Sequence, residues 1–109
     1  MANPSSALTG NKLLLSVNGE TLTGAKTLTL LDKVIQSLDP GGAGRTVTLP
    51  AAATADGYVF IIANTADAAE DITLNDGASP QTTWTASQGE SIMAFSDGVV
   101  WRVIGGAIS

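Results

Sequence analysis

The most apolar stretch of the chain is residues 57–63, with the sequence GYVFIIA. Its short length and its β-branched residues favour a buried strand over a helix, since a helix normally needs a longer periodic segment. No helical periodicity flanks it, and short apolar runs alternate with turn residues instead. The stretch therefore predicts a central strand of an all-β domain.

Short strands and turns are also predicted before this stretch. Residues 46–49 alternate threonine with an apolar residue and end at Pro50, which cannot donate to a strand ladder. Residues 39–44 (DPGGAG) precede them, and their Pro and Gly content predicts a tight turn. Residues 27–30 alternate in the same way, so Leu28 and Leu30 are expected on one face.

The N-terminal region contains a hairpin signal. Asn18 and Gly19 stand between two β-like runs, and Asn-Gly suits a type I′ turn, which needs positive φ at both central residues. We therefore predict a β-hairpin over residues 12–26, as a candidate capsid or subunit contact. Residues 1–11 contain Pro and Gly and are predicted to form an extended N-terminal arm.

Two further strand predictions lie near the C-terminus. Residues 82–86 are expected to pair with residues 91–95 across a Gly-containing turn. Residues 99–104 (VVWRVI) are largely apolar on both faces of the predicted strand, with Arg102 as the exception. We therefore expect this strand to be covered on both sides, with the second side covered by a partner subunit.

The spacing of these strands predicts one domain. Turns recur every 8 to 12 residues, which is typical of sandwiches and barrels. The predicted fold is an antiparallel β-sandwich, jelly-roll-like, with its core in residues 27–106 and a short tail over residues 107–109. The strand order stays open, because short strands of similar alternation permit several arrangements.

Composition excludes several function classes. The chain has 109 residues with no histidine and no cysteine, so nucleophilic triads, zinc sites of the usual type and disulfides are not expected. Lysine and arginine number five against ten acidic residues, for a net charge of −5, which disfavours a nucleic-acid partner. No apolar stretch is long enough to predict a membrane partner.

The acidic residues offer two alternatives to a purely structural role. A pair of carboxylates could in principle hydrolyse a glycosidic bond, but nearly all the acids stand beside turn residues that already explain them. Asp67, Glu70 and Asp71 could offer oxygen ligands to calcium, yet their spacing does not match a known loop. We therefore predict no catalytic residue, no cofactor and no metal.

Apolar and aromatic residues supply the candidate interface. The first part of the chain is unusually rich in leucine for a peripheral segment, and such a segment suits strand addition or chain exchange; the alternative is that it simply forms the first strands of the core. The tryptophans could anchor an interface, stack on sugars or fill the core. The predicted interface residues are Leu8, Leu13, Leu14, Leu15, Val17, Trp84 and Trp101.

Three motifs together carry a resemblance to a known class of proteins. Residues 35–50 (IQSLDPGGAGRTVTLP) resemble a segment of tailed-bacteriophage virion proteins, in which Leu-Asp-Pro leads through a Gly-rich turn to Arg-x-Val-x-Leu-Pro. In those proteins Gly-x-x-Phe-x-Ile-x-Asn follows, here residues 57–64, and Asp-Gly-x-x-Trp comes later, here residues 97–101. The resemblance covers residues 27–104 and is shared by decoration proteins, head fibres and tail-fibre modules.

Among these roles the small size favours a capsid decoration (cement) protein. The resemblance then implies a homotrimer bound to the major capsid protein on the capsid exterior, assembled in the host bacterial cytoplasm. It implies adhesion and no enzymatic activity. The alternatives are a tail-fibre, head-fibre or baseplate module, and a carbohydrate-binding module with surface glycans as partners.

Overall fold

The computed structural model describes residues 13–104, which form nine strands and one short 3-10 helix. The elements are β1 (Val17–Thr21), β2 (Lys26–Thr27), β3 (Ile35–Asp39), β4 (Arg45–Thr48), η1 (Ala52–Thr54), β5 (Val59–Asn64), β6 (Ile72–Asn75), β7 (Thr83–Ala86), β8 (Ser91–Ser96) and β9 (Trp101–Ile104). The prediction of one all-β domain is confirmed. No helix within residues 13–104 is long and apolar enough to cross a membrane. The predicted arm (1–11) and tail (107–109) lie outside the described residues.

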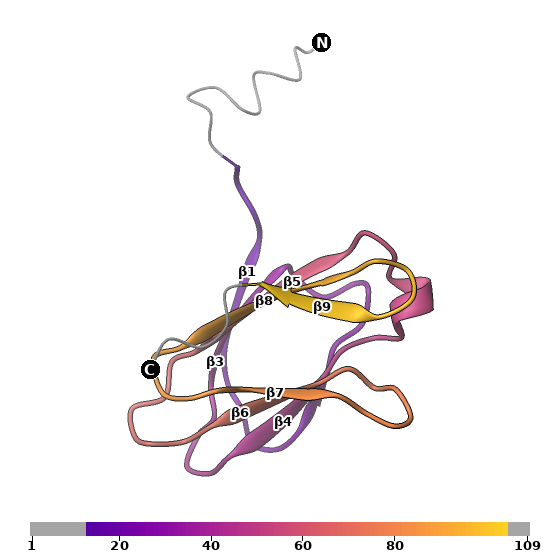
Figure 1. The fold of residues 1–109 in the computed structure, drawn as a ribbon. Helices are drawn as coiled ribbons and strands as arrows, with labels where there is room; N and C mark the ends of the chain where they lie inside the picture. Colours follow the sequence, from indigo (N-terminus) through magenta and orange to yellow (C-terminus); the bar gives the residue numbers. More distant parts are fainter. Residues whose placement is uncertain (1–12, 105–109) are drawn as a thin grey trace.

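The strands form two mixed sheets (Figure 1). One sheet has five strands in the order β1-β3-β5-β8-β9, and the other has four in the order β2-β4-β6-β7. The first six strands alternate between the sheets and pair in parallel within each, so this part of the chain winds repeatedly from one sheet to the other. The last three strands then add in antiparallel pairing, β7 to β6, β8 to β5 and β9 to β8.

The pairing overturns three predictions. Antiparallel pairing is wrong for the first six strands. Asn18 and Gly19 form no hairpin turn, because they lie inside β1, which makes a parallel ladder with β3 instead. Residues 82–86 and 91–95 do not pair with each other, because β7 and β8 belong to different sheets. The turn residues predicted that each strand pairs with the next strand in the sequence. Because the chain winds between the two sheets, strands that are further apart in the sequence pair instead.

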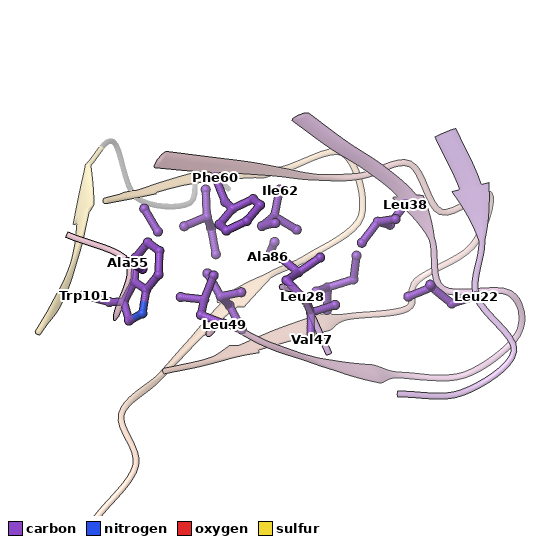
Figure 2. Packing of buried hydrophobic residues seen from close by; sticks show 14 residues of the cluster. Leu22, Leu28, Leu38, Val47, Leu49, Ala55, Phe60, Ile62, Ala86 and Trp101 are labelled. Carbon is purple, nitrogen blue, oxygen red and sulfur yellow. The ribbon is translucent and has the colours of Figure 1, made fainter. Parts of the chain in front are cut away.

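A single apolar cluster fills the space between the sheets (Figure 2). It draws on both sheets because alternate residues of each strand point inward, as Phe60 and Ile62 do on β5 and Val47 does on β4. Leu22, from the segment predicted as a hairpin, also belongs to it. Trp101 is 4% exposed, and its ring centroid lies 6.1 Å from that of Phe60. The cluster fixes which face of each sheet is left outside.

The predicted turn over residues 39–44 is confirmed. Gly41 has φ +77°, a conformation that strongly favours glycine. A Cβ at this position would also collide with the carbonyl oxygen of Leu22. Arg45 Nε donates to the carbonyl oxygen of Pro40 (2.7 Å), which closes the turn before β4 begins.

Candidate functional site

The outer face of the five-stranded sheet carries a row of apolar side chains, one from each strand. Residues paired directly in a ladder point to the same face, and the registers align five such residues across the sheet. In strand order the apolar row is Val17, Ile35, Ile61, Met93 and Ile104. Their chain neighbours on β5, Phe60 and Ile62, are buried in the core, so the row faces away from it.

The apolar row is accessible at both ends and at Met93, next to one end. Val17 on β1 is 51% exposed and Ile104 on β9 is 52% exposed, while Met93 is 37% exposed. Val59 and Phe95 pair beside the row on the same face and extend its apolar surface. An apolar surface that crosses a whole sheet is what an interaction site presents, whereas single exposed apolar residues are ordinary.

Residues 13–16, which precede β1, add to this surface. In Figure 1 they leave the end of β1 and extend away from the two sheets. Leu13 is 75% exposed and Leu14 is 92% exposed, whereas Leu15 is partly covered. Leu13, Leu14, Leu15 and Val17, all predicted interface residues, therefore lie at one edge of the apolar row. Leu8, also predicted, lies outside the described residues.

A groove of about 560 Å³ lies between residues 13–15 and the outer face of the five-stranded sheet. Its lining is mainly apolar and includes Leu13, Leu15, Val34, Tyr58, Ile61 and Met93. Asp56 is the one charged residue that lines it. The groove thus joins the apolar row to the segment before β1, and we call the row, the groove and residues 13–16 together the apolar face.

The outer face of the four-stranded sheet has the opposite chemistry. Its outward residues form two cross-strand rows of hydroxyl and amide side chains. The first row is Thr27, Thr48, Asn75 and Thr83, and the second is Thr46, Thr73 and Thr85. We call this the threonine face. Threonine suits a strand as well as valine does, but its hydroxyl keeps the face wettable.

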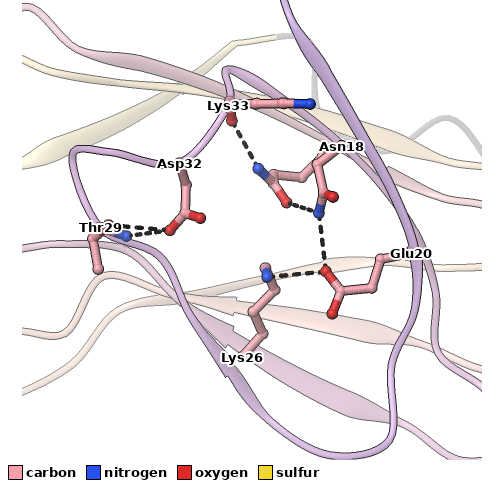
Figure 3. A network of polar contacts seen from close by, with 7 residues as sticks. Asn18, Glu20, Lys26, Thr29, Asp32 and Lys33 are labelled. Atoms are coloured by element: carbon pink, nitrogen blue, oxygen red, sulfur yellow. Dashed lines mark hydrogen bonds and ion pairs between the residues drawn. The ribbon is translucent and has the colours of Figure 1, made fainter.

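A polar network joins the two sheets beside β1 (Figure 3). Asn18 Nδ2 donates to Glu20 Oε1 and to Gln36 Oε1, both at 2.9 Å, and Lys26 Nζ lies 3.0 Å from Glu20 Oε1. These hydrogen bonds, first that of Asn18 and then that of Lys26, lower the pKa of Glu20. Gln36 is fully buried, and its amide also donates to the carbonyl oxygen of Lys33 (2.7 Å). The network holds β1, β2 and β3 together.

Several acidic side chains close turns. Asp97 Oδ1 accepts hydrogen bonds from the backbone N–H groups of Val99 and Val100, both at 2.9 Å, and these bonds are the main reason that the pKa of Asp97 is lowered. Bonds to nearby backbone N–H groups are also made by Asp32, Asp76 and Glu90. Turn chemistry, which the sequence predicted for the acids, accounts for these four.

Three carboxylates gather at one end of the molecule. Oxygen atoms of Asp39, Asp67 and Glu70 lie within 4.8 Å of one another, so the structure brings Asp39 rather than the predicted Asp71 to this cluster. Glu70 Oε1 is buried without a hydrogen-bond partner among the described residues. Asp39 already accepts a hydrogen bond from Gly41 N–H (2.9 Å), and Asp67 is exposed. These are the residues that could hold a hard cation, and the same arrangement fits a solvated acidic turn.

Both tryptophans point inward rather than to an outer face. Trp101 is buried, and its indole N–H donates to the carbonyl oxygen of Pro50 (2.7 Å). Trp84 is partly buried and packs against the core. Trp101 was predicted as an interface residue and lies in the core instead, because β9 turns Trp101 inward and Ile104 outward. A sugar-stacking platform needs an exposed ring, and Trp101 does not offer one.

Comparisons with protein-family models, with curated proteins and with solved structures find no match to this chain. The inference of function therefore depends on the surfaces described above. The most distinctive of them is the apolar face.

Proposed function

We propose that this chain is a decoration protein, a structural virion protein that binds the outer surface of a bacteriophage capsid and stabilises the shell. The apolar face is the observation that carries the proposal. The chain builds a row of five apolar residues across a sheet, and no helix or strand within residues 13–104 is laid over it. A surface of this kind is made for adhesion to another protein, and adhesion is all that a decoration protein requires.

The size of the apolar face indicates how tightly one copy of such a protein would bind a capsid. Five strands about 4.8 Å apart, each contributing about five residues at about 3.3 Å, present about 400 Å². Only about half of the outward positions on this face are apolar, because Ser37, Ser91 and Arg102 also point outward. At about 25 cal/mol per Å² of apolar surface, burying the face therefore supplies about 5 kcal/mol before costs. Association costs about 4–15 kcal/mol, so one copy alone would bind weakly. Firm attachment then requires several linked copies on a repeating surface, as a homotrimer on a lattice of major capsid protein would provide.

The choice of a phage capsid as the partner comes from the sequence resemblance. The resembling motifs form β3, β4 and the turn between them, strand β5, and the turn that leads into β9, which are parts of the scaffold. They support a virion β-module, and the apolar face supports an adhesive role for it. A position on the capsid exterior follows from the decoration role. A tail-fibre or head-fibre module is the alternative within the same class, and it would be present in few copies per virion.

Binding to capsids that lack the protein tests the proposal. We expect the purified protein to co-sediment with bare capsids in a saturable way, at a fixed ratio to the capsid protein. Ile104→Lys places a charge at one end of the apolar row and should weaken binding at least tenfold, since burying that side chain is worth about 1.5–3 kcal/mol. Val17→Lys should do the same at the other end.

A matched control lies on the opposite face. Thr85→Lys introduces the same charge on the threonine face and should leave capsid binding unchanged. Circular dichroism would establish that all three variants fold. The proposal is overturned if the unaltered protein does not bind bare capsids, or if Thr85→Lys weakens binding as much as Ile104→Lys does.

A further inference from the structure

Among residues 13–104, no side chain covers Leu14. Residues 13–16 are extended, so successive side chains point to opposite sides. Leu13 and Leu15 line the groove on the outer face of the five-stranded sheet, and Leu14 points away from it. Leu14 is 92% exposed and lies beside Leu13, which is 75% exposed, so the two leucines form one exposed apolar surface.

The groove is the complementary feature. It has a volume of about 560 Å³, and its lining consists mainly of apolar side chains, among them Val34, Ile61 and Met93. Each copy thus has an exposed apolar side chain, Leu14, and an apolar groove that this side chain of another copy could fill. We infer that copies of this chain associate through residues 13–16, so that Leu14 of one copy enters the groove of a neighbouring copy while Leu13 and Leu15 still line the groove of their own.

Charge favours a second copy as the occupant. The chain carries a net charge of −5, so copies repel one another except where apolar, uncharged surface is presented. Residues 13–16 have no charged side chain, and the one charged residue that lines the groove is Asp56. Residues 13–16 thus match the apolar lining of the groove and bring no further negative charge to it.

Area favours this association over simple contact between two sheets. The outer face of the five-stranded sheet presents about 400 Å², roughly half of the area that each partner buries in a standard interface. The association adds a second contribution, because each copy buries its own Leu14 and also the groove that receives Leu14 of a neighbour. A side chain given to one neighbour and received from another closes a ring, which is compatible with the predicted homotrimer.

This inference concerns the chain alone and stands whether or not it binds a capsid. The first test is the solution mass, measured by light scattering on a sizing column. We expect a multiple of 11.0 kDa for the unaltered protein and a shift toward 11.0 kDa for Leu14→Ser. Leu31 is a matched control because it is 95% exposed, lies in a turn and is not part of the groove lining. Leu31→Ser should keep the mass of the unaltered protein.

A cross-linking test identifies the groove as the acceptor. The chain has no cysteine, so a mixture of Leu14→Cys protein with Met93→Cys protein can form a mixed disulfide only between copies. We expect this mixture to give a covalent dimer of the two different chains on oxidation. A mixture of Leu31→Cys with Met93→Cys should give far less of it.

Three outcomes would overturn the inference. The first is a mass of 11.0 kDa for the unaltered protein at every concentration tested. The second is an oligomer that Leu14→Ser leaves intact. The third is a cross-link yield between positions 14 and 93 that is no higher than that between positions 31 and 93. Failure of capsid binding, with the mass and cross-link results as expected, would overturn the proposed function and leave this association intact.

Discussion

The two sheets of this protein have the same inner chemistry and opposite outer chemistry. Both contribute aliphatic side chains to one core. On the outside, the five-stranded sheet presents the apolar row Val17, Ile35, Ile61, Met93 and Ile104 beside a row of small residues, Gly19, Ser37, Ala63 and Ser91. The four-stranded sheet has no such apolar row among its described residues and presents threonine and asparagine instead. Valine, isoleucine and threonine all suit strands, so folding alone does not require this difference. The difference is better explained by the surroundings of each face in the folded protein. A threonine face can remain in contact with water, whereas burying an apolar face against a partner lowers the free energy.

The first prediction concerns what keeps the two sheets together, and it has the largest expected effect. Asn64 on β5 is 2% exposed, and its side-chain amide donates to the carbonyl oxygens of Glu70 (2.8 Å) and Ala86 (2.9 Å). Its Oδ1 also accepts from Ala66 N–H (2.9 Å). Asn64→Leu would leave these backbone groups without partners, so we expect the free energy of unfolding to fall by about 3 kcal/mol. Urea denaturation measures this change.

An outward-facing asparagine provides the control. Asn75 on the threonine face makes its side-chain hydrogen bonds at exposed positions, with Gln81 and Gly77. Asn75→Ala should therefore cost about 1 kcal/mol or less, because water replaces the lost partners. If the two variants lost equal stability, Asn64 would not be the link between the sheets that its contacts indicate.

The sequence predicted individual strands far better than their pairing. The strand over residues 57–63 and the turn over residues 39–44 were both found, because alternation and turn residues act locally. The parallel ladder of β1 with β3 was missed, since β2 lies between them in the chain and in the other sheet. The Asn18–Gly19 pair was misleading for the same reason. Its turn preference depends only on neighbouring residues, whereas β1 pairs with β3, which lies later in the chain.

The candidate site was predicted only at its N-terminal edge. Leu13, Leu14 and Val17 were found because three leucines in succession stand out in a peripheral segment. Ile61 and Met93 were missed as surface residues, since their common face becomes visible only when β5 and β8 are aligned in register. One signal was available: residues 99–104 were predicted to be apolar on both sides, with a partner covering the second. Ile104 lies at the outer position that this prediction implies.

The second prediction exchanges the chemistry of the two faces. Replacing Val17, Met93 and Ile104 together by threonine should lower the free energy of unfolding by about 1 kcal/mol at most, because these side chains are partly exposed already. The same variant should lose both capsid binding and binding of a fluorescent hydrophobic dye. Replacing Thr46, Thr73 and Thr85 by valine should keep the fold and increase dye binding on the other face. Loss of the fold in the first variant would show that the apolar row supports the sheet rather than contacts a partner.

The third prediction has the smallest effect and concerns the edge where the two sheets meet beside β1. The Asn18 hydrogen bond and the Lys26 ion pair lower the pKa of Glu20, so near that pKa the unfolded chain binds more protons than the folded one. The stabilisation is therefore fully present above the ordinary glutamate pKa, and it is lost as the pH falls through the lower pKa of the folded state. Because Glu20 is partly exposed and screened by solvent, we expect only about 0.5 kcal/mol.

The measurement for Glu20 is a difference between two unfolding curves. Glu20→Gln removes the charge, so its free energy of unfolding should lie about 0.5 kcal/mol below that of the unaltered protein at pH 7. The gap should close in acid, and added salt should narrow it at pH 7. Asp97 has a lowered pKa too, but it is present in both proteins and cancels in the difference. A difference in the free energy of unfolding that stayed constant from pH 7 to pH 3 would mean that Glu20 contributes through packing rather than charge. The two sheets would then be held together at this edge by apolar contacts, as they are in the core.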